Sequence, residues 1–167
     1  LQNKPRFAHV LKLAADKAGW GQPLPAGRAR GIALMEGYDT YIAEVAEISL
    51  EGGEVKVHRV TVAADLGHMV NPDTVEAQIQ SGVVFGMGAA LKQEITLDKG
   101  RVQQTNYHQF EVPRWHEAPP VDIVLVPSRE KPGGIGEPST ALIAPAIANA
   151  VATLTGKRVR KLPLTAE

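Results

Sequence analysis

The sequence contains no cysteine among its 167 residues. Disulfides, thiol nucleophiles, cysteine-ligated iron–sulfur clusters and cysteine-containing zinc sites all require a thiol, so this chain alone can build none of them. The sequence also lacks a surplus of charge, because 18 lysines and arginines balance 18 aspartates and glutamates. This balance argues against a strongly basic nucleic-acid-binding domain and against an acidic tail, although a local basic patch is compatible with it.

The sequence has no apolar run long enough to cross a membrane. Its longest apolar stretch, from Ala141 to Leu154, has 14 residues and is interrupted by Pro145, Asn149 and a threonine. Because a spanning helix needs about 20 apolar residues, no membrane span is expected. The chain starts at Leu1, not at methionine, so we expect it to be part of a longer protein. Any targeting signal would lie upstream, and the location, cytoplasmic or periplasmic, stays open.

The residues that are present indicate a globular chain, with 44% hydrophobic and 22% charged residues. Apolar periodicity predicts a helix over residues 5–18 that ends at Gly19. A connector rich in proline and glycine follows over residues 21–30. Alternating β-branched residues then predict antiparallel strands between residues 30 and 65, with a hairpin turn at residues 51–53.

The second half of the chain is predicted to contribute two more helices. The first, over residues 73–91, follows an Asn-Pro pair suited to a helix start. It contains three glycines, at positions 82, 86 and 88. Each costs about 0.5–1 kcal/mol relative to alanine in a helix interior, which indicates a close approach by another backbone or by a ligand. The second helix is expected over residues 138–155, with a kink or a restart at Pro145.

Between these helices, a second hairpin is expected over residues 93–98 and 101–110, a short strand over 121–126, and a loop over 127–136. The chain shows no internal repeat. Taken together, the elements predict an α+β fold of antiparallel hairpins packed with about three helices.

The segment Lys131–Thr140, KPGGIGEPST, is the strongest candidate for a functional site. Glycine-rich loops that run into helices place backbone N–H groups where they can meet anions. A dinucleotide-binding loop is not supported, because Ser139 replaces the third glycine and the required downstream acid is absent. Glu137 has two interpretations: a carboxylate that caps the helix and is favoured by its dipole, or a general base presented in a pocket.

Other kinds of chemistry find little support. The five histidines form no i, i+4 pair and no His-x-His motif, so a metal site made of protein ligands is not expected. No serine lies in a G-x-S-x-G motif. Gln78, within the predicted helix 73–91, fits a solvated helix face.

Several short motifs follow one another in a distinctive order along the chain. They are Ala63-Ala64-Asp65-Leu66-Gly67, Val70-Asn71-Pro72, Gly86-Met87-Gly88, Gly134-Ile135-Gly136-Glu137-Pro138 and Gly156-Lys157-Arg158-Val159-Arg160. This order resembles the molybdenum hydroxylase family of xanthine dehydrogenases and aldehyde oxidoreductases. The C-terminal segment looks most like the large subunit of bacterial isoquinoline oxidoreductase. The resemblance implies that residues 1–167 are the C-terminal portion of the molybdopterin-binding domain, with a helix at 1–20, a connector at 21–30 and the family core at 31–167.

The resemblance also implies a reaction and roles for three residues. Members of this family hydroxylate an electron-poor carbon of an N-heteroaromatic ring or an aldehyde, with oxygen taken from water. Glu137 falls on the active-site glutamate that acts as general base, and Gln78 on a glutamine that hydrogen-bonds the pterin. Gly136 would let Glu137 approach the metal, and the glycines of helix 73–91 would let chain and cofactor pack closely. The pterin itself holds the metal through sulfur, so no protein ligand to the metal is expected.

The remaining implications concern cofactors and partners. The cofactor would be molybdopterin cytosine dinucleotide with Mo, and the electrons would leave through a small subunit with [2Fe-2S] clusters. The upstream rest of the large subunit would carry most cofactor contacts, so the chain alone is expected to be inactive. Two alternatives stay open: a non-catalytic subunit that shares Glu137, and a small-ligand-binding α+β domain without molybdenum.

Overall fold

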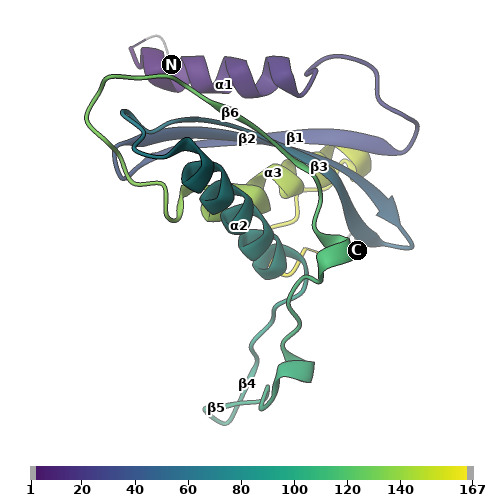
Figure 1. Cartoon of the computed structure of the whole chain (residues 1–167). Coiled ribbons are helices and arrows are strands. Elements are labelled where there is room, and N and C mark those ends of the chain that lie inside the picture. Colours follow the sequence, from purple (N-terminus) through teal and green to yellow (C-terminus); the bar gives the residue numbers. More distant parts are fainter. Residues whose placement is uncertain (1–2, 165–167) are drawn as a thin grey trace.

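The computed structural model describes residues 3–164. Its centre is a four-stranded sheet with one helix on one face and two helices on the other (Figure 1). Helix α1 (Pro5–Lys17) covers the first face, and α2 (Pro72–Leu91) and α3 (Pro138–Thr155) cover the second. The three α-helices agree with the predicted ranges to within one residue at each end, and the α+β class is confirmed.

The sheet has the strand order β1–β2–β3–β6. Strands β1 (Arg28–Gly37), β2 (Thr40–Glu51) and β3 (Glu54–Asp65) are antiparallel neighbours, as predicted. Strand β6 (Val121–Leu125) instead runs parallel to β3. Hairpins therefore account for only three of the four strands, and the fourth joins through a long crossover that contains α2.

Each face of the sheet has its own core, because side chains alternate across a strand. Ile42, Ala46 and Ile48 of β2 belong to the core beneath α2 and α3. Ala43 and Val45, on the same strand, belong to the core beneath α1. The core beneath α2 and α3 contains more buried residues than the core beneath α1, so most of the apolar burial lies on the face of the sheet that α2 and α3 cover.

Helix α3 crosses β1 at a glycine. A Cβ on Gly31 would lie 2.0 Å from the Ala146 carbonyl oxygen and 2.4 Å from the Ala150 nitrogen. The Asn149 side chain strengthens the crossing by donating to the Ile32 carbonyl at 2.9 Å. The helix runs through Pro145 without a break, so the predicted restart there was wrong. Because backbone touches backbone at this crossing, the position of α3 on the sheet is closely defined.

The glycines of α2 face protein atoms. A Cβ on Gly82 would lie 2.0 Å from the Ser139 Oγ, and a Cβ on Gly86 would lie 2.4 Å from the Thr140 carbonyl oxygen. Both neighbours belong to the first turn of α3, so the close approach inferred from sequence is an approach of two helices. These two glycines are therefore explained by helix packing, and the expected packing against a cofactor is not needed to account for them.

Among the described residues, α3 is the one helix whose length and apolar composition would suffice to cross a membrane. Its apolar residues, including Ile143 and Ile147, are instead part of the core beneath α2 and α3. A core helix passes the same test of length and composition, so this is weak evidence for a span.

Residues 92–118, here called the arm, extend away from the end of α2 (Figure 1). The predicted second hairpin is reduced to the two-residue strands β4 (Leu97–Asp98) and β5 (Arg101–Val102). Two short 3-10 turns, η1 (Tyr107–Gln109) and η2 (Trp115–Glu117), follow. No residue of the arm is fully buried. The prediction of longer strands was wrong because a two-stranded ribbon without a covered face has little to stabilise it.

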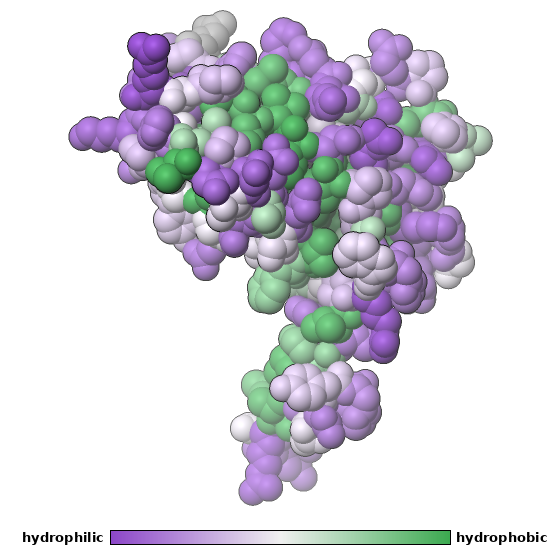
Figure 2. Space-filling model, viewed as in Figure 1, coloured by the Kyte–Doolittle hydropathy of each residue, from purple (hydrophilic) through white to green (hydrophobic). Residues whose placement is uncertain are grey.

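The arm exposes apolar side chains. Its large exposed hydrophobic residues are Ile95, Leu97, Val102, Tyr107, Val112 and Trp115. Figure 2 shows hydrophobic surface along this projection. At its base, Lys92 forms ion pairs with Glu111 and Glu117, which tie the two ends of the arm together.

Candidate active site

The loop between β6 and α3 is held in place by the turn that follows β3. The His68 backbone N–H donates to the Glu130 carbonyl at 2.9 Å, and the Gly133 N–H donates to the Leu66 carbonyl at 2.7 Å. Gly67 has a φ of +75°, and a Cβ there would lie 2.1 Å from the Lys131 carbonyl oxygen. Both the left-handed backbone and the close contact therefore require glycine at this position.

The same turn is anchored to α1 by an ion pair. The Arg6 guanidinium donates two hydrogen bonds of 2.7 Å to the Asp65 carboxylate, and the Gly67 N–H donates to the same carboxylate at 3.2 Å. These hydrogen bonds hold the pKa of Asp65 below its usual value, and the bond with Arg6 has the largest effect. Burial acts in the opposite direction and raises this pKa. Asp65 thus stays ionised and links α1 to the turn that holds the loop.

The turn between β1 and β2 holds the loop from a second side. The Gly134 N–H donates to the Tyr38 carbonyl at 2.7 Å, and the Thr40 hydroxyl donates to the Gly134 carbonyl at 2.7 Å. Gly133 lies so close that a Cβ would be 2.6 Å from the Thr40 Oγ1. The glycines expected to bind an anion thus let the loop pack against this turn.

Glu137 ends this loop, directly before α3. It occupies the N-cap position, yet its side chain makes no capping hydrogen bond. One carboxylate oxygen, Oε2, instead accepts a hydrogen bond of 2.9 Å from the Tyr38 hydroxyl. The residue is exposed in the described part of the chain. The side chain therefore does not cap the helix through a hydrogen bond, and its other oxygen, Oε1, is available to a ligand.

Gln78 of α2 reaches the same loop. Its side-chain N–H donates to the Gly136 carbonyl at 2.7 Å, which places it one residue from Glu137. The amide is exposed, as a solvated helix face predicts, but it is also oriented by this bond. The structure thus brings together all three residues singled out from the sequence: Gln78, Gly136 and Glu137.

These residues suit a metal held by its own cofactor. The described residues contain no group of three or more His, Cys, Asp or Glu side chains that could hold a metal ion. A Cβ on Gly136 would meet nothing within 4 Å, so the outer side of the loop is open to a bulky group. Within residues 3–164, the Gln78 carbonyl oxygen and the second carboxylate oxygen of Glu137 have no hydrogen bond. The two free oxygens and the open side of the loop therefore fit a bulky, polar group such as a pterin.

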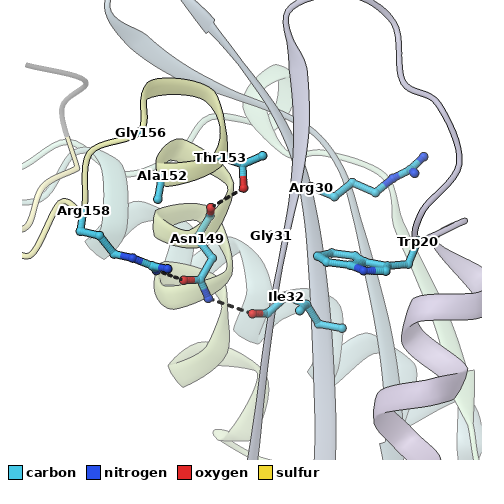
Figure 3. A pocket seen from close by; sticks show the side chains of 9 residues that line it. All are labelled: Trp20, Arg30, Gly31, Ile32, Asn149, Ala152, Thr153, Gly156 and Arg158. Carbon is cyan, nitrogen blue, oxygen red and sulfur yellow. Dashed lines mark hydrogen bonds between the residues drawn. The ribbon is translucent and has the colours of Figure 1, made fainter.

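A separate groove of about 390 Å³ lies at the free edge of β1 (Figure 3). Its lining includes Trp20, Asn149 and Arg158, with Asn149 accepting a hydrogen bond of 2.9 Å from Arg158. Asn149 is twelve residues after Glu137 along α3, or about 18 Å at 1.5 Å per residue. This groove is therefore not part of the Glu137 site.

Two buried polar side chains lack partners in the part of the chain that the structure describes. Neither the carboxyl oxygens of Glu44 nor the Ser139 hydroxyl form a hydrogen bond there. Glu44 lies on β2 with its side chain fully buried, and burial raises its pKa well above the usual value. Burial thus favours the protonated form of this carboxyl group.

Residues 22–119 match the family model described as the molybdopterin cofactor-binding domain. The match covers more than half of the chain, from the connector before β1 through the arm. The chain belongs to the molybdopterin-binding family of the molybdenum hydroxylases. The resemblance that the motifs indicated is thereby confirmed.

Relatives in this family are much longer than this chain. It is 31% identical to the beta subunit of isoquinoline 1-oxidoreductase of Brevundimonas diminuta over 98% of this chain and 22% of that protein. It is also 31% identical to a nicotinate dehydrogenase subunit of Pseudomonas putida over 98% of this chain and 15% of that protein. The chain thus spans about a fifth or less of these relatives.

Solved structures in the family share the fold. Quinoline 2-oxidoreductase from Pseudomonas putida 86 superposes with a TM-score of 0.70 at 21% identity. The superposition covers 76% of this chain and 18% of that one. At this identity the likeness shows the architecture alone.

The sequence motifs identified the loop residues of this site but not its supports. Glu137 and Gly136 are recognisable from a short contiguous motif, and Gln78 from its place in the family pattern. Tyr38 lies 99 residues from Glu137, so no local pattern connects the two. For Glu44 the sequence offered one signal of a buried acid, namely its place between apolar residues of a predicted strand.

Proposed function

We propose that this chain is the part of a molybdenum hydroxylase catalytic subunit that carries the general base. The observation that carries the proposal is the loop at Glu137, which is fixed from three elements while one carboxylate oxygen stays free. Such a subunit would hydroxylate a carbon of an N-heterocycle or an aldehyde. The names of the relatives, which include an isoquinoline oxidoreductase and a nicotinate dehydrogenase, support heterocyclic substrates.

In this proposal Glu137 accepts the proton released when water-derived oxygen attacks the substrate. A general base needs an acceptor atom within hydrogen-bond reach and a carboxylate held in one orientation. The bond from Tyr38 fixes Oε2 and leaves Oε1 for the proton. The bound cofactor would supply the redox chemistry. Residues of this chain would orient the cofactor and accept the proton.

Gln78 and Gly136 would hold the pterin. The Gln78 amide donates one N–H to the Gly136 carbonyl, which leaves its carbonyl oxygen and second N–H for ring atoms of the cofactor. Gly136 offers open space on its outer side, so a flat group could approach the backbone beside Glu137. The cytosine dinucleotide form of the cofactor is the one we propose.

Two protein partners complete the proposed enzyme. The rest of the large subunit would cover the exposed Glu137 and the apolar side chains of the arm, and a small subunit with [2Fe-2S] clusters would take the electrons. Both relatives are named as one subunit of an enzyme, which supports an assembly of several chains. Because Glu137 and Gln78 lie on an open surface of the described chain, the chain alone is expected to be inactive.

The test is Glu137→Gln in the complete enzyme that contains this chain. Loss of a general base should lower kcat by about a hundredfold or more, while the molybdenum content measured by mass spectrometry stays at the wild-type level. Glu54→Gln is the matched control, since it removes an exposed carboxylate at the β2–β3 turn. Retention of most activity by Glu137→Gln would show that the carboxylate is not the base.

A further inference from the structure

The Tyr38 hydroxyl is the one side-chain hydrogen-bond partner of Glu137 among residues 3–164. Tyr38 lies in the two-residue turn between β1 and β2, where Gly37 and Thr40 are paired. Both turn residues have left-handed backbones, with φ of 56° at Tyr38 and 61° at Asp39. A tyrosine is uncommon in this conformation, and here it directs the phenol toward the loop.

The backbone on both sides of this contact is already fixed. The Tyr38 carbonyl accepts a hydrogen bond from the Gly134 N–H. The two residues are close, because a Cβ on Gly134 would lie 3.0 Å from the Tyr38 Cβ. Thr40 is fully buried, and its hydroxyl donates a second hydrogen bond between the turn and the loop, to the Gly134 carbonyl. The backbones of the turn and the loop are thus tied together, and the exposed phenol and carboxylate meet at 2.9 Å between them.

In this contact the Tyr38 phenol is the hydrogen-bond donor and the Glu137 carboxylate is the acceptor. The hydrogen bond to the carboxylate raises the pKa of Tyr38 above its usual value of 10.0, so the phenol remains a donor at neutral pH. Within residues 3–164, Lys131 of the loop forms no salt bridge with Glu137. The other nearby charged residues, Asp39 in the turn and Asp73 and Glu76 at the start of α2, are acids and cannot form one. A neutral donor therefore orients the carboxylate without neutralising it.

We propose that Tyr38 is a positioning residue for Glu137, whose hydroxyl holds Oε2 so that Oε1 meets the reacting proton. This inference rests on the proposed function of Glu137. A misplaced catalytic group loses much of its rate advantage. Tyr38 thus sets the direction of the base.

The first test uses the complete enzyme. In Tyr38→Phe, kcat per bound molybdenum should fall by about tenfold to a hundredfold with little change in KM. Tyr41→Phe is the matched control, because its hydroxyl contacts Glu36 instead. A variant that was merely less stable would yield less molybdenum-loaded enzyme but keep the wild-type kcat per molybdenum. A wild-type kcat per molybdenum in Tyr38→Phe would overturn the inference.

Glu137→Gln in the same assay separates the two proposals. If it abolishes turnover while Tyr38→Phe behaves as wild type, the inference fails and the general base stands. If Glu137→Gln stays active, the proposed function fails and the inference fails with it.

The second test needs no activity. The chain has three tyrosines, so changing Tyr41 and Tyr107 to phenylalanine leaves Tyr38 as the one phenol to titrate by ultraviolet absorbance. Adding Glu137→Gln should lower its titration midpoint, since the carboxylate raises the pKa of Tyr38. Adding Glu36→Gln, whose carboxylate contacts Lys4, should not. An unchanged midpoint in Glu137→Gln would overturn the contact itself.

Discussion

The body of the molecule and its arm differ in how their apolar residues are used. In the body, helices cover both faces of the sheet, and α3 touches β1 so closely that only glycine fits at Gly31. In the arm, residues 92–118, six large apolar side chains are exposed and no residue is fully buried. The body thus builds the frame that positions Glu137, whereas the arm presents surface. Substitutions in the body should therefore lower the stability of the chain, whereas most substitutions in the arm should leave it nearly unchanged.

The largest effect is expected at the contact between α3 and β1. In Gly31→Val, the new Cβ would collide with two backbone atoms of α3, at 2.0 and 2.4 Å, which no rotamer can relieve. We expect a loss of about 3 kcal/mol or more in the free energy of unfolding, measured by denaturant titration of the chain.

Gly100→Ala in the arm is the comparison for that measurement. A Cβ there would touch nothing within 4 Å, and only its φ of +78° causes strain, so the cost should be about 1 kcal/mol. Equal losses for the two variants would contradict the distinction between body and arm.

The next effect compares two apolar truncations of similar size. Ile147→Ala removes a fully buried side chain of α3 and should cost about 2–5 kcal/mol through lost burial and the cavity left behind. Leu97→Ala removes a side chain that is 68% exposed in the arm and should change stability by less than about 0.5 kcal/mol. Thermal or denaturant unfolding of both variants measures the contrast. A large loss for Leu97→Ala would mean that the arm carries a core of its own.

A smaller, pH-dependent effect is expected at Glu44. Burial raises the pKa of this carboxyl well above its usual value. The folded state therefore retains a proton that the unfolded state releases above its own pKa of about 4.3. Stability should decline as pH rises from there toward the folded pKa. In Glu44→Gln this decline should disappear, so the variant gains stability relative to wild type as pH increases.

The arm supplies the control for Glu44. Glu94→Gln removes an exposed carboxylate and should leave the pH dependence of stability unchanged. If the wild-type curve and the Glu44→Gln curve are parallel from acid to neutral pH, Glu44 is ionised in the folded chain and has a partner there.

Local signals explain what the sequence could predict, and distance explains what it could not. Asn71 caps α2 through its side chain as expected, and Gly156 ends α3 with a φ of +72°, because such caps depend on neighbouring residues. The Glu137 loop is likewise a contiguous motif. The parallel pairing of β6 with β3 and the contact from Tyr38 to Glu137 join residues far apart in sequence, and a period or a motif carries no information about such pairs.

The smallest effect in the chain is expected at Trp115, which is 95% exposed in the arm. Trp115→Ala should change the free energy of unfolding of the 167-residue chain by less than about 0.5 kcal/mol. In the complete subunit the proposed cover over the arm would bury this indole, and the same substitution should then destabilise by about 3–5 kcal/mol. The difference between the two measurements isolates the contribution of the covering partner. If Trp115→Ala is neutral in both, the arm stays exposed in the assembled enzyme, and its apolar side chains do not serve as an interface with the rest of the subunit.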